Sequence, residues 1–90
     1  MNSGTITVEF FGMPRQRAGC AELVVPAGTL AEVLQAVERA CPGLSALIHP
    51  DGKLAPQYLL SIDGQRFVTE PDERLRPGEH VLLLSADAGG

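Results

Sequence analysis

The sequence is poor in aromatic residues and in lysine, and both shortages exclude something. Its 90 residues include three Phe, one Tyr and no Trp, so the core of a folded domain must be built mainly from Leu and Val. Lys53 is the single lysine beside six arginines, and the formal net charge is −4. Because phosphate binding needs clustered Lys and Arg, we expect no nucleic-acid partner.

Cysteines and long apolar runs are also scarce. Cys20 and Cys41 are too few for a disulfide framework, a Cys-x-x-Cys metal clip or a four-thiolate iron–sulfur cluster, so we expect two reduced, partly buried thiols. No apolar run approaches the roughly 20 residues of a membrane-spanning helix. The N-terminus lacks the basic and then apolar pattern of a secretory signal. We therefore expect a cytoplasmic protein without a membrane partner.

Histidine offers no metal or catalytic site by its spacing. His49 lies in a predicted turn and His80 at a predicted strand start, and no carboxylate or cysteine partner is evident near either in the pattern. Metal ligands and general bases need such partners. The sequence therefore predicts no metal site.

The first third of the chain predicts two paired strands. Residues 5–11 alternate, with Ile6, Val8 and Phe10 on one face, which indicates a half-buried strand. Residues 13–19 are polar and predict a turn, and residues 21–26 predict a second strand that ends at Pro26. A short connection between two strands favours a hairpin.

A helix is predicted over residues 29–40. Thr29 and Glu32 have the spacing of a capping box, in which each side chain satisfies a free backbone N–H. Apolar residues follow at helical spacing, and Pro42-Gly43 ends the pattern. The residues expected on the buried face are Leu30, Val33, Leu34 and Val37.

The second half predicts three more strands. Residues 44–48 leave open one further helical turn, and residues 57–62 alternate as a strand. Asp63-Gly64 predicts a tight hairpin to a short strand at 66–68. Residues 70–75 read as a polar connection, Pro77-Gly78 suits a type II turn, and residues 80–85 form the last strand.

The element order predicts the fold class. With 44% hydrophobic and 20% charged residues, the composition is that of a single globular domain. One helix between two hairpins must lie across a single face of a mixed sheet. The sequence therefore predicts an α+β protein with four or five strands, in which the first and last strands are neighbours at the centre.

The last sixteen residues, LRPGEHVLLLSADAGG, combine a turn, an apolar strand, small residues and a final Gly-Gly. Together with the element order, this resembles the β-grasp (ubiquitin-like) proteins of the MoaD/ThiS sulfur-carrier family over nearly the whole chain. The resemblance implies a β-grasp domain at residues 1–85 and a flexible Gly-Gly tail at residues 86–90.

The resemblance also implies a function for the tail. Members of this family carry sulfur as a thiocarboxylate on the terminal glycine, which here is Gly90. An E1-like partner enzyme would adenylate the Gly90 carboxylate with ATP, a sulfur-donor protein would supply sulfur, and an acceptor synthase would take it. The chain itself would bind no cofactor and would not be an enzyme. Gly89 and Ala88 keep the tail thin enough to enter a narrow active site.

A partner-binding surface is predicted beside the tail. Residues 81–84 are all apolar although a strand with one buried face would alternate. If Val81 and Leu83 face the helix, the opposite side of the sheet presents apolar residues to partners, as in ubiquitin-like proteins. The predicted docking residues are Phe11, Leu59, Leu82 and Leu84.

One departure and several alternatives stay open. Residues 44–56 form a longer segment than in the thiamine-type carriers and look more like the molybdopterin-type and cysteine-biosynthesis-type members. The departure is Asp87, which stands where several relatives have an apolar residue. The acceptor is expected to be a molybdopterin synthase large subunit. The alternatives are a carrier for cysteine, tRNA thiolation or secondary-metabolite synthesis, a ubiquitin-like modifier that forms isopeptide bonds, and an interaction domain with an inert tail.

Overall fold

The structure is a computed structural model that describes residues 4–86. The elements in chain order are β1 (Thr5–Phe10), α1 (Met13–Ala18), β2 (Glu22–Pro26), β3 (Gly28–Thr29), α2 (Leu30–Ala40), β4 (Tyr58–Ile62), β5 (Arg66–Phe67), β6 (Arg74–Leu75) and β7 (His80–Ser85). No helix in this part of the chain has the length and apolar character needed to cross a membrane.

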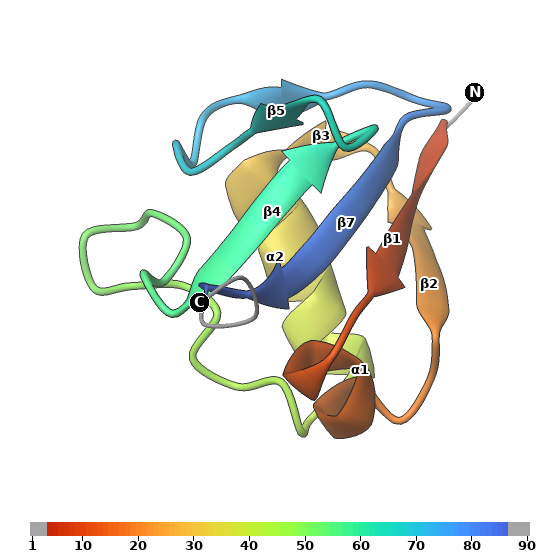
Figure 1. Cartoon of the computed structure of the whole chain (residues 1–90). Coiled ribbons are helices and arrows are strands. Elements are labelled where there is room, and N and C mark those ends of the chain that lie inside the picture. The colour runs from red at the N-terminus through yellow and green to blue at the C-terminus, as the bar shows by residue number, and fades with distance from the viewer. Residues whose placement is uncertain (1–3, 87–90) are drawn as a thin grey trace.

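Five strands form a mixed sheet in the order β2-β1-β7-β4-β5 (Figure 1). β1 pairs with β2 in the antiparallel direction and with β7 in the parallel direction. β4 is antiparallel to both β7 and β5. The predicted α+β class is confirmed, and so is the prediction that the first and last strands are central neighbours.

The helix α2 crosses one face of this sheet (Figure 1). Its four predicted core residues are each 0–1% exposed and belong to one apolar cluster with the inward side chains of the strands. The strand residues of this cluster include Ile6, Val8, Phe10, Leu60, Val81 and Leu83. The predicted packing of helix against sheet is therefore confirmed, with Leu and Val as the main components.

The start of α2 follows the predicted capping box. The Thr29 Oγ1 accepts from the Glu32 N–H at 3.2 Å, and Glu32 Oε1 accepts from the Thr29 N–H at 2.9 Å. Two further N–H groups, of Leu30 and Ala31, donate to the carbonyls of Glu73 and Pro71. The free N–H groups at the start of the helix are thus satisfied partly by the side chains of the capping box and partly by backbone carbonyls of the distant 71–73 loop.

The prediction of a polar turn at residues 13–19 is wrong, because this segment is the helix α1. Pro14 lies in its first turn, where its missing N–H is not needed. Gly19 ends it in the left-handed conformation at φ 78°, and its N–H donates to the Arg15 carbonyl at 3.1 Å. Only Pro14 of this helix is buried, so no apolar period marks the segment.

The prediction that residues 70–75 are only a polar connection is also wrong. β6 pairs with β3 in a second, two-stranded sheet, through Gly28 opposite Leu75 and Thr29 opposite Arg74. Leu75 is 1% exposed. The pairing holds this connection against the start of α2 and buries the side chain of Leu75. The polar residues that precede Leu75 in the sequence gave no sign of this burial.

Residues 44–56 form a folded loop and not a further helical turn. Leu44, Leu47 and Leu54 are buried, and Ile48 pairs with Leu54 across a turn at residues 49–52. The Leu54 N–H donates to the Thr69 carbonyl at 3.1 Å. The longer segment is therefore anchored in the core at both ends.

We predict that Leu34→Ala lowers the free energy of unfolding by about 2–5 kcal/mol, because it removes a fully buried side chain from the contact between helix and sheet. Gln35→Ala is the matched control, since Gln35 is exposed on the same helix and should change stability by less than about 0.5 kcal/mol. Chemical denaturation of both variants checks this. Equal stability of the two variants would contradict the packing.

Candidate functional site

The face of the sheet opposite to α2 carries rows of side chains, and three of these rows bear on the candidate site. We call it the open face, because within residues 4–86 no helix lies over it (Figure 1). The strand registers define the rows. The first row is Phe11, Leu84 and Leu59; the second is Glu22, Glu9, Leu82, Ser61 and Phe67; the third is Val24, Thr7 and His80.

The four predicted docking residues lie together on the open face. Leu59 is directly opposite Leu84, and the Phe11 N–H donates to the Leu83 carbonyl at 3.0 Å, which places Phe11 beside the same row. Phe11 is 41% exposed, and Leu82 and Leu84 are half-buried, as is Leu59. Their use by a partner stays a prediction.

Burial confirms the parity on which this surface was predicted. Val81 and Leu83 are 0% exposed on the helix side, while Leu82 and Leu84 alternate with them on the other side. A shift of one residue would have exchanged the two pairs.

An acid–histidine pair lies at the centre of the open face. The Nε2 of His80 lies 2.7 Å from Oε1 of Glu9, and both side chains are partly exposed. The two residues come from the parallel neighbours β7 and β1, far apart in the sequence. The expectation that His80 has no carboxylate partner is therefore wrong, because the partner is brought in by strand pairing.

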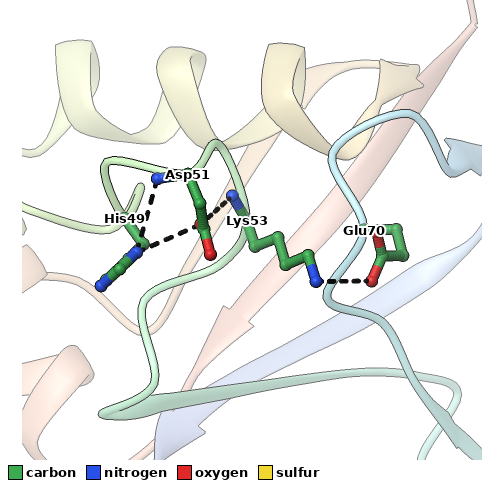
Figure 2. Close-up of polar contacts among 4 residues, drawn as sticks. All are labelled: His49, Asp51, Lys53 and Glu70. Carbon is green, nitrogen blue, oxygen red and sulfur yellow. Dashed lines mark hydrogen bonds and ion pairs between the residues drawn. The ribbon is translucent and has the colours of Figure 1, made fainter.

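His49 also has a carboxylate partner, in the turn shown in Figure 2. Its Nδ1 lies 3.2 Å from Oδ1 of Asp51, and the Nζ of Lys53 lies 3.5 Å from Oε2 of Glu70. The Lys53 backbone N–H donates to Asp51 at 2.9 Å and lowers the pKa of that carboxyl, with a smaller contribution from His49. The expectation for His49 is therefore wrong as well.

The charged groups of this turn are engaged with one another. They border a groove of about 310 Å³ that Leu54, Pro56 and Thr69 also line. Within residues 4–86, no three His, Cys, Asp or Glu side chains are grouped as a metal site would require. The turn is closed by backbone hydrogen bonds from the His49 N–H to the Lys53 carbonyl and from the Gly52 N–H to the His49 carbonyl.

The base of the tail is held at the end of β7. Ser85 is opposite Tyr58, and the Ala86 N–H donates to the Gln57 carbonyl at 2.8 Å. The hydrogen-bonded structure thus continues to residue 86, one residue past the predicted domain boundary. A groove of about 260 Å³ adjoins this point and is lined by Met13, Arg17, Gln57, Tyr58 and Ser85.

The residues predicted to carry out the chemistry follow Ala86 in the sequence. Gly90, Gly89 and Ala88 are outside the residues that the structure describes, and so is Asp87. Their predicted roles, and the predicted flexibility of the tail beyond Ala86, stay predictions.

Two apolar residues of the open face were missed in the sequence. Phe67 on β5 is 66% exposed and Val24 on β2 is 58% exposed. Val24 could have been assigned to this face, because it alternates with the buried Val25. Phe67 could not, since its strand has two residues and its face depends on pairing with Ser61.

Comparison with known proteins supports the fold at low sequence identity. No protein-family model matches the sequence, and no curated protein matches it. The chain is similar to the crystal structure of SAMP1 from Haloferax volcanii, with a TM-score of 0.78 and 23% identity over 97% of this chain and 100% of that one.

Two further solved structures are similar over most of their length. The solution structure of small archaeal modifier protein 1 (SAMP1) from Methanosarcina acetivorans has a TM-score of 0.76 and 20% identity, and covers 100% of both chains. A Pyrococcus furiosus protein assigned as molybdopterin converting factor, subunit 1, has a TM-score of 0.73 and 19% identity over 92% of this chain and 98% of that one.

These similarities establish the class of fold. The chain has the β-grasp fold of ubiquitin-like proteins. The resemblance to MoaD/ThiS-type proteins that the sequence suggested is thereby confirmed at the level of the fold.

We predict that Leu82→Asp combined with Leu84→Asp leaves a cooperatively folded protein, because both side chains lie on the open face. Val81→Asp is the control, and it should prevent folding by placing an unpaired carboxylate in the core. Thermal unfolding followed by circular dichroism compares the variants. Loss of folding in the double variant would show that this face is part of the core.

Proposed function

We propose that this chain is a sulfur carrier of the MoaD/ThiS type. The carboxylate of Gly90 is activated by a partner enzyme, converted to a thiocarboxylate and used as a sulfur donor. The observation that carries the proposal is the arrangement at the end of β7. There the central strand of a β-grasp sheet ends beside the apolar row of Phe11, Leu84 and Leu59, and the sequence continues from it to Gly89-Gly90.

The chemistry proceeds in three balanced steps. The Gly90 carboxylate attacks ATP at the α-phosphate, so an acyl adenylate forms and pyrophosphate leaves. A persulfide or sulfide sulfur then attacks the acyl carbon and AMP leaves, which yields the thiocarboxylate once any persulfide bond is reduced by a thiol. The acceptor enzyme takes the sulfur, and water restores the carboxylate. Adenylation is needed because a carboxylate by itself is a poor electrophile.

The composition of the tail suits a reaction inside another protein. Ala86 is held by Gln57, so the four residues that follow span at most about 14 Å when fully extended. Ala88, Gly89 and Gly90 bring at most one methyl group each into that space. Gly also adopts positive φ without strain, which lets one tail fit two different active sites.

In this proposal the partners bind the open face. An E1-like adenylating enzyme and an acceptor synthase must each dock beside the tail, and the apolar row Phe11–Leu84–Leu59 lies next to its base. Phe11 and Phe67 are exposed aromatic residues, and their burial against a partner would contribute to the binding free energy. We place the proposed reaction in the cytoplasm, where ATP is available to the activating enzyme.

The acceptor we propose is the large subunit of a molybdopterin synthase. Support comes from the structural similarity to the Pyrococcus furiosus protein assigned as molybdopterin converting factor, subunit 1. The chain itself acts as a cosubstrate and supplies no catalytic group. Asp87 must then meet a cationic or hydrogen-bonding group of the acceptor, because a carboxylate is not buried without one.

A second candidate function is protein modification. The similarity to two archaeal SAMP1 structures, one described as a small archaeal modifier protein, favours it. The steps up to the adenylate are shared, and a lysine amine of a target protein then attacks in place of sulfur. The product is an isopeptide at Gly90, with AMP as the leaving group.

The chemical test begins with the native protein. Its intact mass first establishes that Gly90 is the terminal residue. We then predict that ATP, the activating enzyme and a sulfur donor replace one carboxylate oxygen with sulfur, localised by mass spectrometry to the C-terminal peptide. Deletion of Gly90, or addition of one residue after it, should abolish the change. Equal modification of the extended protein would refute the proposal, whereas conjugates on a denaturing gel would favour the modifier.

We also predict that Phe11→Ser with Leu84→Ser slows activation by about tenfold or more, because each truncation of a central docking residue costs roughly 1 kcal/mol or more of binding free energy. Val24→Ser is the matched control on the same face, outside the apolar row, and should leave the rate unchanged. Initial rates at subsaturating carrier concentration measure this. Equal loss in the control would mean that the row has no special role.

A further inference from the structure

The two cysteines lie at neighbouring helix ends. Cys20 follows Gly19, the C-cap residue of α1, and Cys41 is itself the C-cap residue of α2. These helix ends are packed closely, because a Cβ added to Gly43 would collide with the carbonyl oxygen of Arg17. Folding thus brings together two thiols that are far apart in the sequence.

The thiols are neighbours but differ in access to solvent. The Cys20 side chain lies close enough to affect the Cys41 thiol electrostatically. Cys41 is only 3% exposed, whereas Cys20 is exposed. Burial raises the pKa of the Cys41 thiol, and the neighbouring Cys20 raises it further. Cys20 is therefore the sulfur that reagents reach first, and Cys41 lies behind it.

The exposed thiol of Cys20 lines a groove that also contains the cationic side chain of Arg15. This groove of about 560 Å³ is lined by Arg15, Gln16 and Cys20 together with the backbone around Gly12, Gly19 and Ala21. The guanidinium of Arg15 can pair with a carboxylate of a small thiol compound. The groove thus combines the exposed Cys20 thiol with the charge of Arg15, and the buried Cys41 thiol lies behind Cys20.

We propose that Cys20 and Cys41 form a redox pair that a small disulfide compound closes to an intramolecular disulfide. The Cys20 thiolate attacks the small disulfide, forms a mixed disulfide and releases one small thiol. The Cys41 thiolate then attacks the Cys20 sulfur and releases the second small thiol. In total two protein thiols are oxidised and one small disulfide is reduced to two thiols.

The disulfide would tie the end of α1 to the end of α2. It closes a loop that contains β2, β3 and α2, which restricts the unfolded chain. It also anchors α1, whose Met13 and Arg17 line the groove at the base of the tail. The inference does not depend on the chemistry proposed for Gly90, because neither cysteine lies on the open face or in the tail.

The test uses the full chain, fully reduced and then exposed to oxidised glutathione. We expect the intact mass to fall by two hydrogens with no glutathione retained, and unreduced peptides to show a Cys20–Cys41 link. The oxidised protein should melt at a higher temperature than the reduced one, and dithiothreitol should reverse the difference.

Single-cysteine variants separate the two steps. Cys41→Ser should keep one glutathione on Cys20, and Cys41→Ala does the same if the serine variant folds poorly. Cys20→Ser should react little, because its remaining thiol is buried. The proposal is overturned if the native chain keeps glutathione on Cys20 as these Cys41 variants do. It is also overturned if the native chain forms only dimers, does not react, or closes the disulfide only in urea.

Discussion

Residues from opposite ends of the described chain meet in the parallel pairing of β1 with β7, and most of the other features follow from that contact. Parallel neighbours cannot be joined by a tight turn, so a long crossover is required. Here the crossover contains α2, which covers one face of the sheet. The pairing also places Glu9 beside His80 and brings Phe11 beside Leu84. The open face is therefore a product of this one register.

Where the local sequence pattern and the burial in the folded domain agree, the sequence was sufficient to predict the secondary structure and its packing. Alternation at residues 5–10, the capping box at Thr29 and the helical period after it predicted β1, α2 and their packing, because each pattern exists to bury the same core. In α1 they do not agree. Its signals are Pro14 and Gly19, which also occur in turns, and it has no apolar face. β3 and β6 have two residues each and form because the start of α2 contacts the 71–75 segment.

The residues of the candidate site also fall into those that the sequence could predict and those that it could not. The apolar run at residues 81–84 revealed that β7 is apolar on both faces, and this was enough to predict Leu82 and Leu84 opposite α2. Which side chains lie next to them depends on strand register, so Phe67 and the Glu9–His80 pair could not be found without the structure. The choice between sulfur and amine chemistry lies outside the fold altogether, because in the proposed reactions the nucleophile that attacks the adenylate would come from a partner.

The position of β7 between β1 and β4 has a mechanical consequence. A force applied to the tail acts along the axis of β7, whereas the hydrogen bonds to its two neighbours run across that axis. Such a load is a shear that all of these bonds resist together, and they cannot open one after another as in the peeling of an edge strand. An enzyme that draws the tail into a tunnel would therefore pull on a strand that is hydrogen-bonded on both sides, and the domain would resist unfolding under that tension.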